Sequence, residues 1–143
     1  MLHKSCRAGS FLRCSFALHF DRRPRPLLRT RGHVEAHPQE LRIYESSSGR
    51  VPFAEWLGRL RDARARAAIR VRLDRLADGN AGHCDPVGHG VRELKINVGL
   101  GYRVYFAHAG PAIILLLIGG VKASQQRDIR TAQEYWREYK GSE

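Results

Sequence analysis

The stretch Gly99-Leu100-Gly101-Tyr102-Arg103-Val104-Tyr105-Phe106 decides the fold, because a turn signal in it is followed at once by a strand pattern. Before it, residues 91–97 alternate between apolar and polar with the two-residue period of a half-buried strand. The two glycines mark a turn, since glycine adopts positive φ without a steric penalty. A second turn signal at 108–111 leads into the apolar run 112–118. The sequence therefore predicts three strands in an antiparallel meander.

Length and composition indicate one basic domain. The 143 residues can bury a real core, and the formal net charge of +11 indicates a polyanionic partner. The cations are 21 Arg and 4 Lys; this bias suits phosphate recognition by the planar guanidinium, or reflects a GC-rich genome. Three cysteines without framework spacing favour a reducing cytosol. Because the longest apolar run is far below the roughly 18 residues of a membrane span, we expect a cytoplasmic protein with no membrane contact.

The first forty residues differ from the rest in charge and pattern. They carry a net charge of +5, and Arg22-Arg23-Pro24-Arg25-Pro26 breaks any helix. An Arg-rich, acid-poor segment can be a transit peptide, but these prolines interrupt the long amphipathic helix that such a peptide needs. We interpret residues 1–40 as a basic, disordered extension or a mis-assigned start, with a flexible RNA-binding arm as the competing interpretation. The compact domain is expected to span 41–140.

Helical spacing predicts a hairpin of two helices after a short strand at 41–44. Pro52 suits the first turn of a helix, where its missing N–H costs nothing. Asp62 is a plausible N-cap for a second helix that ends near Ala77, before a glycine stop. A loop is expected at 81–90 and a final helix at 124–139. The inward-facing residues of the three helices are expected to be Phe53, Trp56, Leu57 and Leu60; Ala65, Ile69, Leu73 and Leu76; and Ile129, Ala132, Trp136 and Tyr139.

Arginines crowd the outer surface of the expected hairpin. A solvated helix face explains such a run, and contact with an RNA backbone is the functional alternative, because clustered cations gain affinity by releasing counterions. The residues concerned are Arg59, Arg61, Arg64, Arg66, Arg70, Arg72 and Arg75.

Two constellations invite a metal interpretation. His83, Cys84 and His89 lie close together, but they lack a second ligand pair, and loop polar residues are the simpler interpretation. Asp85-Pro86 followed by Glu93-Leu94-Lys95 is similar to the PD-(D/E)xK pattern of magnesium-dependent nucleases, in which two carboxylates hold the metal and a lysine orients water. That pattern is short, and the strand after Lys95 turns back into a meander. We therefore expect no metal.

A third constellation can act without a metal. In a meander its cations can converge on one edge or face of the sheet, without an obvious carboxylate–histidine pair. The chemistry would be attack by an RNA 2′-hydroxyl on its neighbouring phosphate, with the protein orienting the groups and stabilising the added negative charge. Ordinary surface cations are the alternative. The residues are Arg92, Lys95, Arg103, Lys122, Gln126 and Arg127.

Residues 41–140 resemble the RelE/HigB-like toxins called addiction module killer proteins, of bacterial toxin–antitoxin systems. The resemblance rests on the order and spacing of several short motifs over about a hundred residues, and residues 1–40 lie outside it. The motifs are Tyr44, Pro52-Phe53-Ala54-Glu55-Trp56-Leu57, 88–94, Gly101-Tyr102-Arg103-Val104-Tyr105-Phe106, Leu117-Ile118-Gly119-Gly120 with Lys122, and Gln125-Gln126-Arg127-Asp128-Ile129.

The resemblance implies an α+β fold of the microbial ribonuclease-like kind, with a helical hairpin packed on a small antiparallel sheet and a C-terminal helix. It implies a metal-independent endoribonuclease that cleaves mRNA, commonly in the ribosomal A site, and is inhibited by a helix-turn-helix antitoxin. A non-catalytic RNA- or ribosome-binding protein and a metal-dependent nuclease are the alternatives. No cofactor is expected.

The resemblance also assigns roles to individual residues. Arg103 matches the Gly-Tyr-Arg arginine implicated in phosphate stabilisation, and Lys95 falls near a basic catalytic position. Two departures concern the general acid and base: Lys122-Ala123 replaces an adjacent Lys-Arg pair, and Ile129 stands where RelE places a tyrosine. We expect the remaining roles to be scissile-phosphate binding by Arg92 with Lys95, hydroxyl positioning by Gln126, and RNA binding by Tyr102, Lys122 and Arg127.

Overall fold

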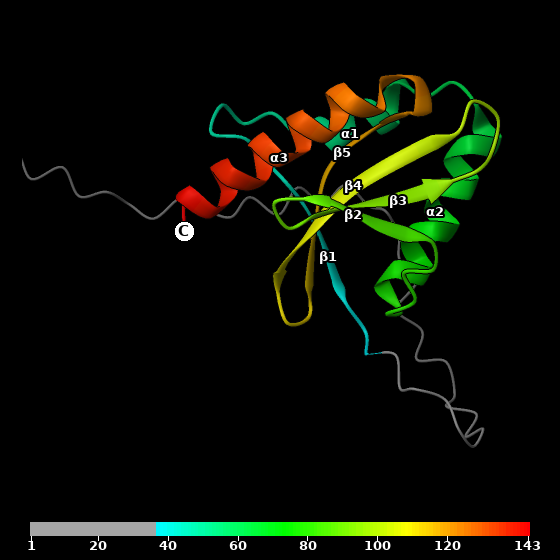
Figure 1. Ribbon diagram of the computed structural model, residues 1–143. Helices are drawn as coiled ribbons and strands as arrows, with labels where there is room; N and C mark the ends of the chain where they lie inside the picture. The colour runs from blue at the N-terminus through cyan, green and yellow to red at the C-terminus, as the bar shows by residue number, and fades with distance from the viewer. Residues whose placement is uncertain (1–36) are drawn as a thin grey trace, which may run out of the picture. The chain divides into compact units, whose positions relative to one another are not determined.

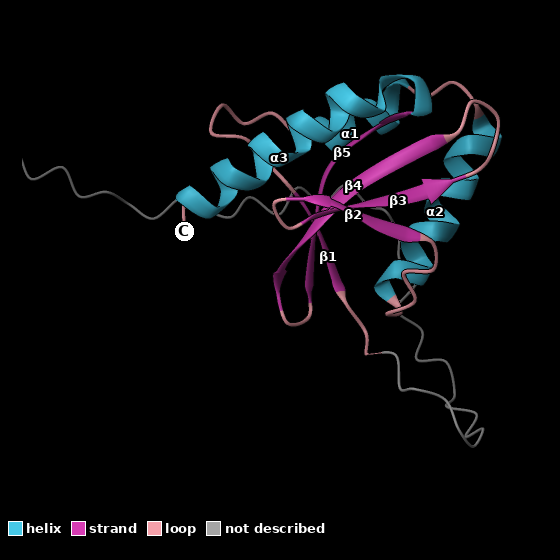
Figure 2. Ribbon diagram, in the orientation of Figure 1, coloured by secondary structure: helices cyan, strands magenta, loops and turns pink. Residues whose placement is uncertain are grey.

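The computed structural model describes residues 37–143, which form a five-stranded sheet with helices on both faces (Figures 1 and 2). The strand order is β1-β5-β4-β3-β2, and every neighbouring pair is antiparallel except β1 with β5. The strands are β1 (Glu40–Ile43), β2 (Cys84–Gly88), β3 (Val91–Ile96), β4 (Tyr102–Gly110) and β5 (Ile113–Val121). The expected α+β fold, with its central meander of β3, β4 and β5, is confirmed.

The helical hairpin covers one face of the sheet. It consists of α1 (Pro52–Arg59) and α2 (Ala63–Ala77). Pro52 opens α1 as expected, and the Asp62 carboxylate caps α2 by accepting from the backbone N–H groups of Arg64 and Ala65 at 2.9 and 3.2 Å. Apolar side chains of the hairpin and the sheet form one buried core: Phe53, Ala65, Ile69, Leu73 and Leu76 with Leu94, Ile96, Tyr102, Val104 and Phe106.

The last helix, α3 (Gln125–Gly141), covers the other face and follows a single 3-10 turn, η1 (Lys122–Ser124). Its inward residues Ala132 and Trp136 join a second core with Tyr105, Ala107 and Leu117 from the sheet. The sheet therefore lies between two apolar layers. Strand alternation decides which layer each side chain enters.

Two consecutive glycines in β5 allow both layers to approach the sheet closely. A Cβ on Gly119 would overlap the ring of Trp56 in α1, and a Cβ on Gly120 would overlap the carboxylate of Asp128 in α3. Because neither glycine carries a side chain, the hairpin can pack closely against Gly119 and α3 can pack closely against Gly120.

The structure corrects two sequence expectations about strands. The segment 81–90, expected to be a loop, contains β2, which pairs with β3 as an edge strand. Pro86 fits there because an edge strand does not need every N–H in the ladder. The first strand runs parallel to β5, so the sheet is mixed rather than wholly antiparallel.

Within 37–143 no helix combines the length and apolar character that crossing a bilayer requires. The expectations for residues 1–36 lie outside the described residues.

Candidate functional site

Side-chain alternation divides the predicted site residues between the two faces of the sheet. Lys95 and Arg103 are direct register partners on β3 and β4, as are Glu93 and Tyr105. Tyr105 belongs to the core beneath α3, so these four residues face α3. Arg92 pairs with Phe106, which lies in the core beneath the hairpin. The expectation that Arg92 shares a face with Lys95 and Arg103 is therefore wrong.

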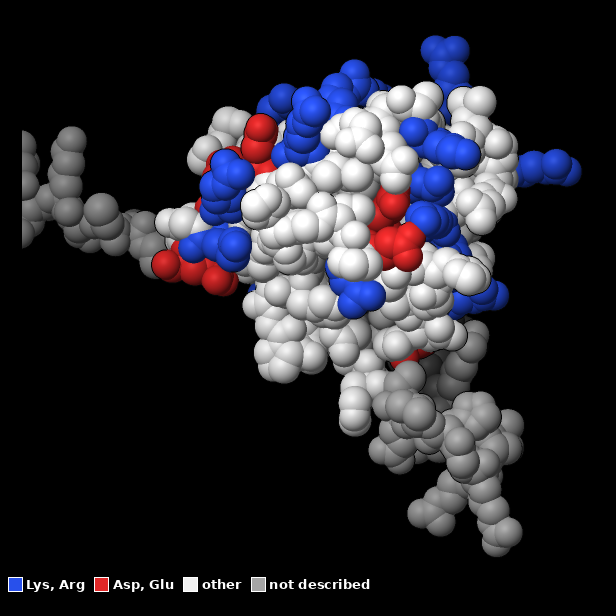
Figure 3. All heavy atoms as spheres, in the orientation of Figure 1, with Lys and Arg blue, Asp and Glu red and all other residues white. Residues whose placement is uncertain are grey.

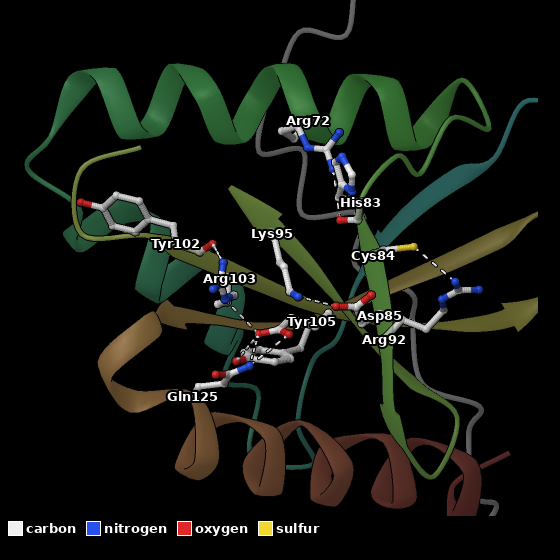
Figure 4. Close-up of polar contacts among 11 residues, drawn as sticks. Arg72, His83, Cys84, Asp85, Arg92, Lys95, Tyr102, Arg103, Tyr105 and Gln125 are labelled. Atoms are coloured by element: carbon white, nitrogen blue, oxygen red, sulfur yellow. Dashed lines mark hydrogen bonds and ion pairs between the residues drawn. The ribbon is translucent and has the colours of Figure 1, made fainter. Parts of the chain in front are cut away.

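Arg92 makes its contacts on the hairpin side. Its Nη2 donates to the Cys84 sulfur at 3.3 Å, and its Nε is buried without a partner in the described structure (Figure 4). Arg92 and Lys95 are three residues apart, an odd spacing that places two strand side chains on opposite faces. Arg92 is thus separated from the Lys95–Arg103 pair by the sheet itself.

The structure also corrects the assignment of Tyr102 to RNA binding. Only 4% of this residue is exposed, and its ring packs edge-on against Trp56 with centroids 6.4 Å apart. A ring buried between the sheet and α1 offers no face on which a base could stack. Tyr102 therefore serves the core.

A buried ion pair dominates the α3 face. Arg103 Nε lies 3.0 Å from Glu93 Oε1, with the two side chains 8% and 2% exposed. The Nε–H is not aligned with that oxygen as a hydrogen bond requires, so the contact is electrostatic. Arg103 Nη1 also approaches the carbonyl oxygen of Tyr102 at 3.5 Å. In the sequence analysis, Glu93 appeared as a candidate only for the metal site. In the structure, Glu93 is the ion-pair partner of Arg103.

Two further side chains converge on the Glu93 carboxylate. Gln125 Nε2 donates to Oε1 at 2.8 Å and lies 3.1 Å from Oε2, and the Tyr105 hydroxyl approaches Oε1 at 3.5 Å (Figure 4). Burial, followed by the negative charges of Glu93 and Asp128, raises the pKa of Tyr105 well above its ordinary value. Tyr105 is therefore a neutral donor at physiological pH.

Lys95 lies at a more open position of the same face. Its Nζ forms a short ion pair with the Asp85 carboxylate of β2, and the two side chains are 34% and 57% exposed. The hydrogen bond and the charge of Lys95 lower the pKa of Asp85 below its usual value. Lys95 is thus a partly exposed cation whose partner in the described structure is Asp85.

The start of α3 supplies the remaining candidate residues. Gln126, Arg127 and Lys122 are exposed, whereas Gln125 points into the site. Gln125, and not Gln126, is therefore the glutamine that contacts the charged cluster. Ser124 donates a short hydrogen bond to the buried carboxylate of Asp128, which holds the first turn of α3 against β5.

The residues of the two metal hypotheses lie near the edge strand. Asp85 and Glu93 are register partners, and Lys95 shares their face, but the carboxylates are paired with Lys95 and Arg103 respectively. Within the described part of the chain, no group of three His, Cys, Asp or Glu side chains is arranged to hold a metal ion.

The surface around this face is strongly basic. Figure 3 shows Lys and Arg side chains gathered along α3 and towards α2, with an acidic group between them. On the hairpin, Arg66 and Arg72 bind backbone carbonyls of Leu60 and Ala81 and so have structural contacts. The exposed arginines of the hairpin are Arg59, Arg61, Arg64, Arg70 and Arg75.

The described residues form a small α+β domain with a cationic face, and sequence comparison places it in a family. Residues 55–137, which include all of the site, match the family described as phage derived protein Gp49-like (DUF891). The protein belongs to this family, which is toxin-like. It is also similar to an uncharacterized protein of Haemophilus influenzae, with 42% identity over 81 residues, or 57% of this chain and 82% of that protein.

Proposed function

We propose that this protein is the toxin of a type II toxin–antitoxin system and that it cleaves mRNA, on the ribosome in the cytoplasm, without a metal ion. The observation that carries the proposal is the register pairing of Lys95 with Arg103 on one face, beside the start of α3. Membership of a phage-derived, toxin-like family and the basic surface support it.

In the proposed reaction, the RNA 2′-hydroxyl attacks its own neighbouring phosphate and the bond from phosphorus to the 5′-oxygen breaks, which gives a 2′,3′-cyclic phosphate and a 5′-hydroxyl. The proton lost by the 2′-oxygen is balanced by the one that the leaving 5′-oxygen gains. Lys95, the more exposed cation, binds and orients the scissile phosphate, exchanging its ion pair with Asp85 for the anion. Arg103, whose side chain is 8% exposed, donates from the part of its guanidinium that Glu93 and the Tyr102 carbonyl oxygen do not hold, to the oxygens that gain charge in the transition state. Lys122 and Arg127 bind flanking phosphates, and Gln126 contacts RNA near the start of α3.

Cleavage of mRNA during translation provides the test. Primer extension on translated mRNA should give discrete cut sites with the wild-type protein and none with Arg103→Lys, which keeps the charge but loses the planar fork. Occupancy of ribosomes or RNA without any cut would favour a non-catalytic binding protein and contradict the proposal.

One observation favours the metal-dependent alternative enough to test it. Asp85 and Glu93 are opposite each other in register, with Lys95 on the same face. A metal-dependent nuclease would lose cleavage in the variant Asp85→Ala. The proposed mechanism predicts that this variant still cleaves.

We also propose an antitoxin partner. An exposed cationic site on a small domain can be blocked by an acidic or amphipathic segment that docks in a groove or adds to a sheet edge. The expected partner is a helix-turn-helix protein encoded beside this one. Co-expression should suppress growth inhibition and yield a stable complex; a neighbouring product that neither binds nor protects would contradict this assignment.

A further inference from the structure

We propose that Glu93 and Gln125 are positioning residues that fix the guanidinium of Arg103 for the reaction. The inference rests on the proposed ribonuclease function and assigns to it two residues that the reaction itself does not use. Glu93 lies in β3 and Gln125 at the start of α3, so the sheet contributes one of the two residues and the helix contributes the other.

Burial and contacts exclude Glu93 from direct contact with RNA. The residue is 2% exposed, and its carboxylate is occupied by Arg103, Gln125 and Tyr105. A general base must reach the proton that it removes, through a hydrogen bond or one water molecule. Glu93 is surrounded by protein donors instead, so its role is to hold Arg103.

The Arg103 side chain needs such a partner because arginine is long and has many rotamers. Glu93 meets the Nε side of the guanidinium at 3.0 Å, and the Tyr102 carbonyl oxygen lies 3.5 Å from Nη1. A donor fixed before the substrate arrives does not have to reorganise as the transition-state charge develops. Glu93 and the Tyr102 carbonyl oxygen thus contact Nε and Nη1, which leaves Nη2 as the nitrogen proposed to meet the phosphate.

Gln125 completes the arrangement by fixing Glu93. Its amide nitrogen lies 2.8 and 3.1 Å from the two carboxylate oxygens, which restrains rotation of the carboxylate. The neighbouring Asp128, held by Ser124 against Gly120, anchors the same turn of α3 to the sheet. The order of contacts therefore runs from α3 through Gln125 and Glu93 to Arg103.

The chain offers a matched control for Gln125. Gln133, two turns further along α3, donates from Nε2 to the Val87 carbonyl oxygen at 2.8 Å. Both glutamines thus join α3 to the sheet by a hydrogen bond of the same length, but Gln133 has no contact with Glu93 or Arg103 in the described structure. Gln125→Ala and Gln133→Ala should therefore have similar effects on stability and different effects on catalysis.

The test is steady-state cleavage of a defined mRNA bound to ribosomes, with thermal unfolding measured for every variant. Gln125→Ala should lower kcat by about 10- to 100-fold with little change in KM, since misplacement of about 1 Å can cost about 10²-fold. Gln133→Ala should leave kcat unchanged. Glu93→Gln, which keeps the shape of the side chain but removes its charge, should lower kcat in the same way, and Glu93→Asp should retain part of the activity.

The outcomes separate the inference from the proposed function. If wild-type protein cleaves RNA and Arg103→Lys does not, while Gln125→Ala keeps full kcat in the folded state, the positioning role is wrong and the proposed function stands. An equal fall in kcat for Gln125→Ala and Gln133→Ala would also contradict positioning. If the wild-type protein does not cleave RNA, the proposed function and this inference both fail.

Discussion

Lys95 and Arg103 face each other directly on neighbouring strands, although both are cations. Like charges in such a pair repel, and the same sheet carries a second like pair, Asp85 opposite Glu93. The ion pairs run along the diagonals, from Lys95 to Asp85 and from Arg103 to Glu93. Two cations are thereby held side by side with their charges balanced. One diagonal is half-exposed and the other is buried.

The exposed diagonal should matter for activity and little for stability. We expect Lys95→Met to slow RNA cleavage by about 10²- to 10³-fold, as the loss of a transition-state donor does, with the thermal midpoint nearly unchanged because exposed ion pairs contribute little. Asp85→Asn, which frees the Lys95 ammonium, should retain cleavage. Measured rates that fall equally in both variants would contradict this division of roles.

The buried diagonal should matter for stability as well as for activity. Arg103→Ala removes the cation next to a carboxylate that is 2% exposed, and breaking a buried pair from one side costs about 3–5 kcal/mol. The double variant Arg103→Gln with Glu93→Gln should recover much of this loss, although it cannot cleave RNA. Urea unfolding measures both, with Arg130→Ala on the exposed side of α3 as a control. A single variant as stable as this control would show that the pair is not buried in solution.

Replacing Gly119 or Gly120 by a residue with a side chain should destabilise the protein. Alanine at Gly119 would meet the Trp56 ring, and alanine at Gly120 the Asp128 carboxylate, so each variant should lose about 1–3 kcal/mol, as overpacked sites do. Gly58→Ala in α1 is the matched control, because a Cβ there meets nothing and alanine stabilises a helix by about 0.5–1 kcal/mol relative to glycine. Equal stabilities for all three variants would contradict the close packing of α1 and α3 on β5.

The stability of the folded protein should depend on pH in the alkaline range. Burial and the nearby carboxylates raise the pKa of Tyr105, and burial also raises the pKa of Tyr44. The folded state then binds these protons more tightly than the unfolded state, so this stability is complete below about pH 10 and is lost as the pH rises towards the folded values. Tyrosinate absorbance should show Tyr44 and Tyr105 titrating late, together with Tyr139, whose pKa burial also raises, and one late tyrosine fewer in Tyr105→Phe. If all five tyrosines titrated together near pH 10 in the folded protein, the predicted rise in the pKa of Tyr44 and Tyr105 would be contradicted.

Local signals in the sequence predicted the frame of the molecule well. Pro52 and the Asp62 cap fixed the starts of α1 and α2, and the glycines at 99 and 101, both with positive φ, fixed the turn of the meander. The alternation of side chains along a strand was also enough to place Arg92. Arg92 and Lys95 are separated by an odd number of residues, so their side chains cannot lie on the same face of the sheet. The sequence therefore predicts the face on which Arg92 lies. The interpretation grouped Arg92 with Lys95 and Arg103 because all three side chains are positively charged.

Long-range contacts account for what the sequence did not predict. The edge strand β2 contains Pro86 and ends at a glycine, so nothing local distinguishes it from a loop before β3 pairs with it. Gln125 reaches Glu93 across 32 positions of sequence, and only the docking of α3 on the sheet decides that Gln125 rather than Gln126 faces inward. Likewise the burial of Tyr102 depends on the ring of Trp56 in α1.

The most direct measurement is cleavage, on the ribosome, of an mRNA that carries a single 2′-deoxy nucleotide on the 5′ side of the cut. Attack by the neighbouring 2′-hydroxyl on a phosphate held by Lys95 and Arg103 predicts that the unmodified RNA is cut, leaving a 5′-hydroxyl on the downstream fragment. The deoxy substitution should abolish that cut. Cleavage that persists at the deoxy position, or that leaves a 5′-phosphate on the downstream fragment, would contradict the account.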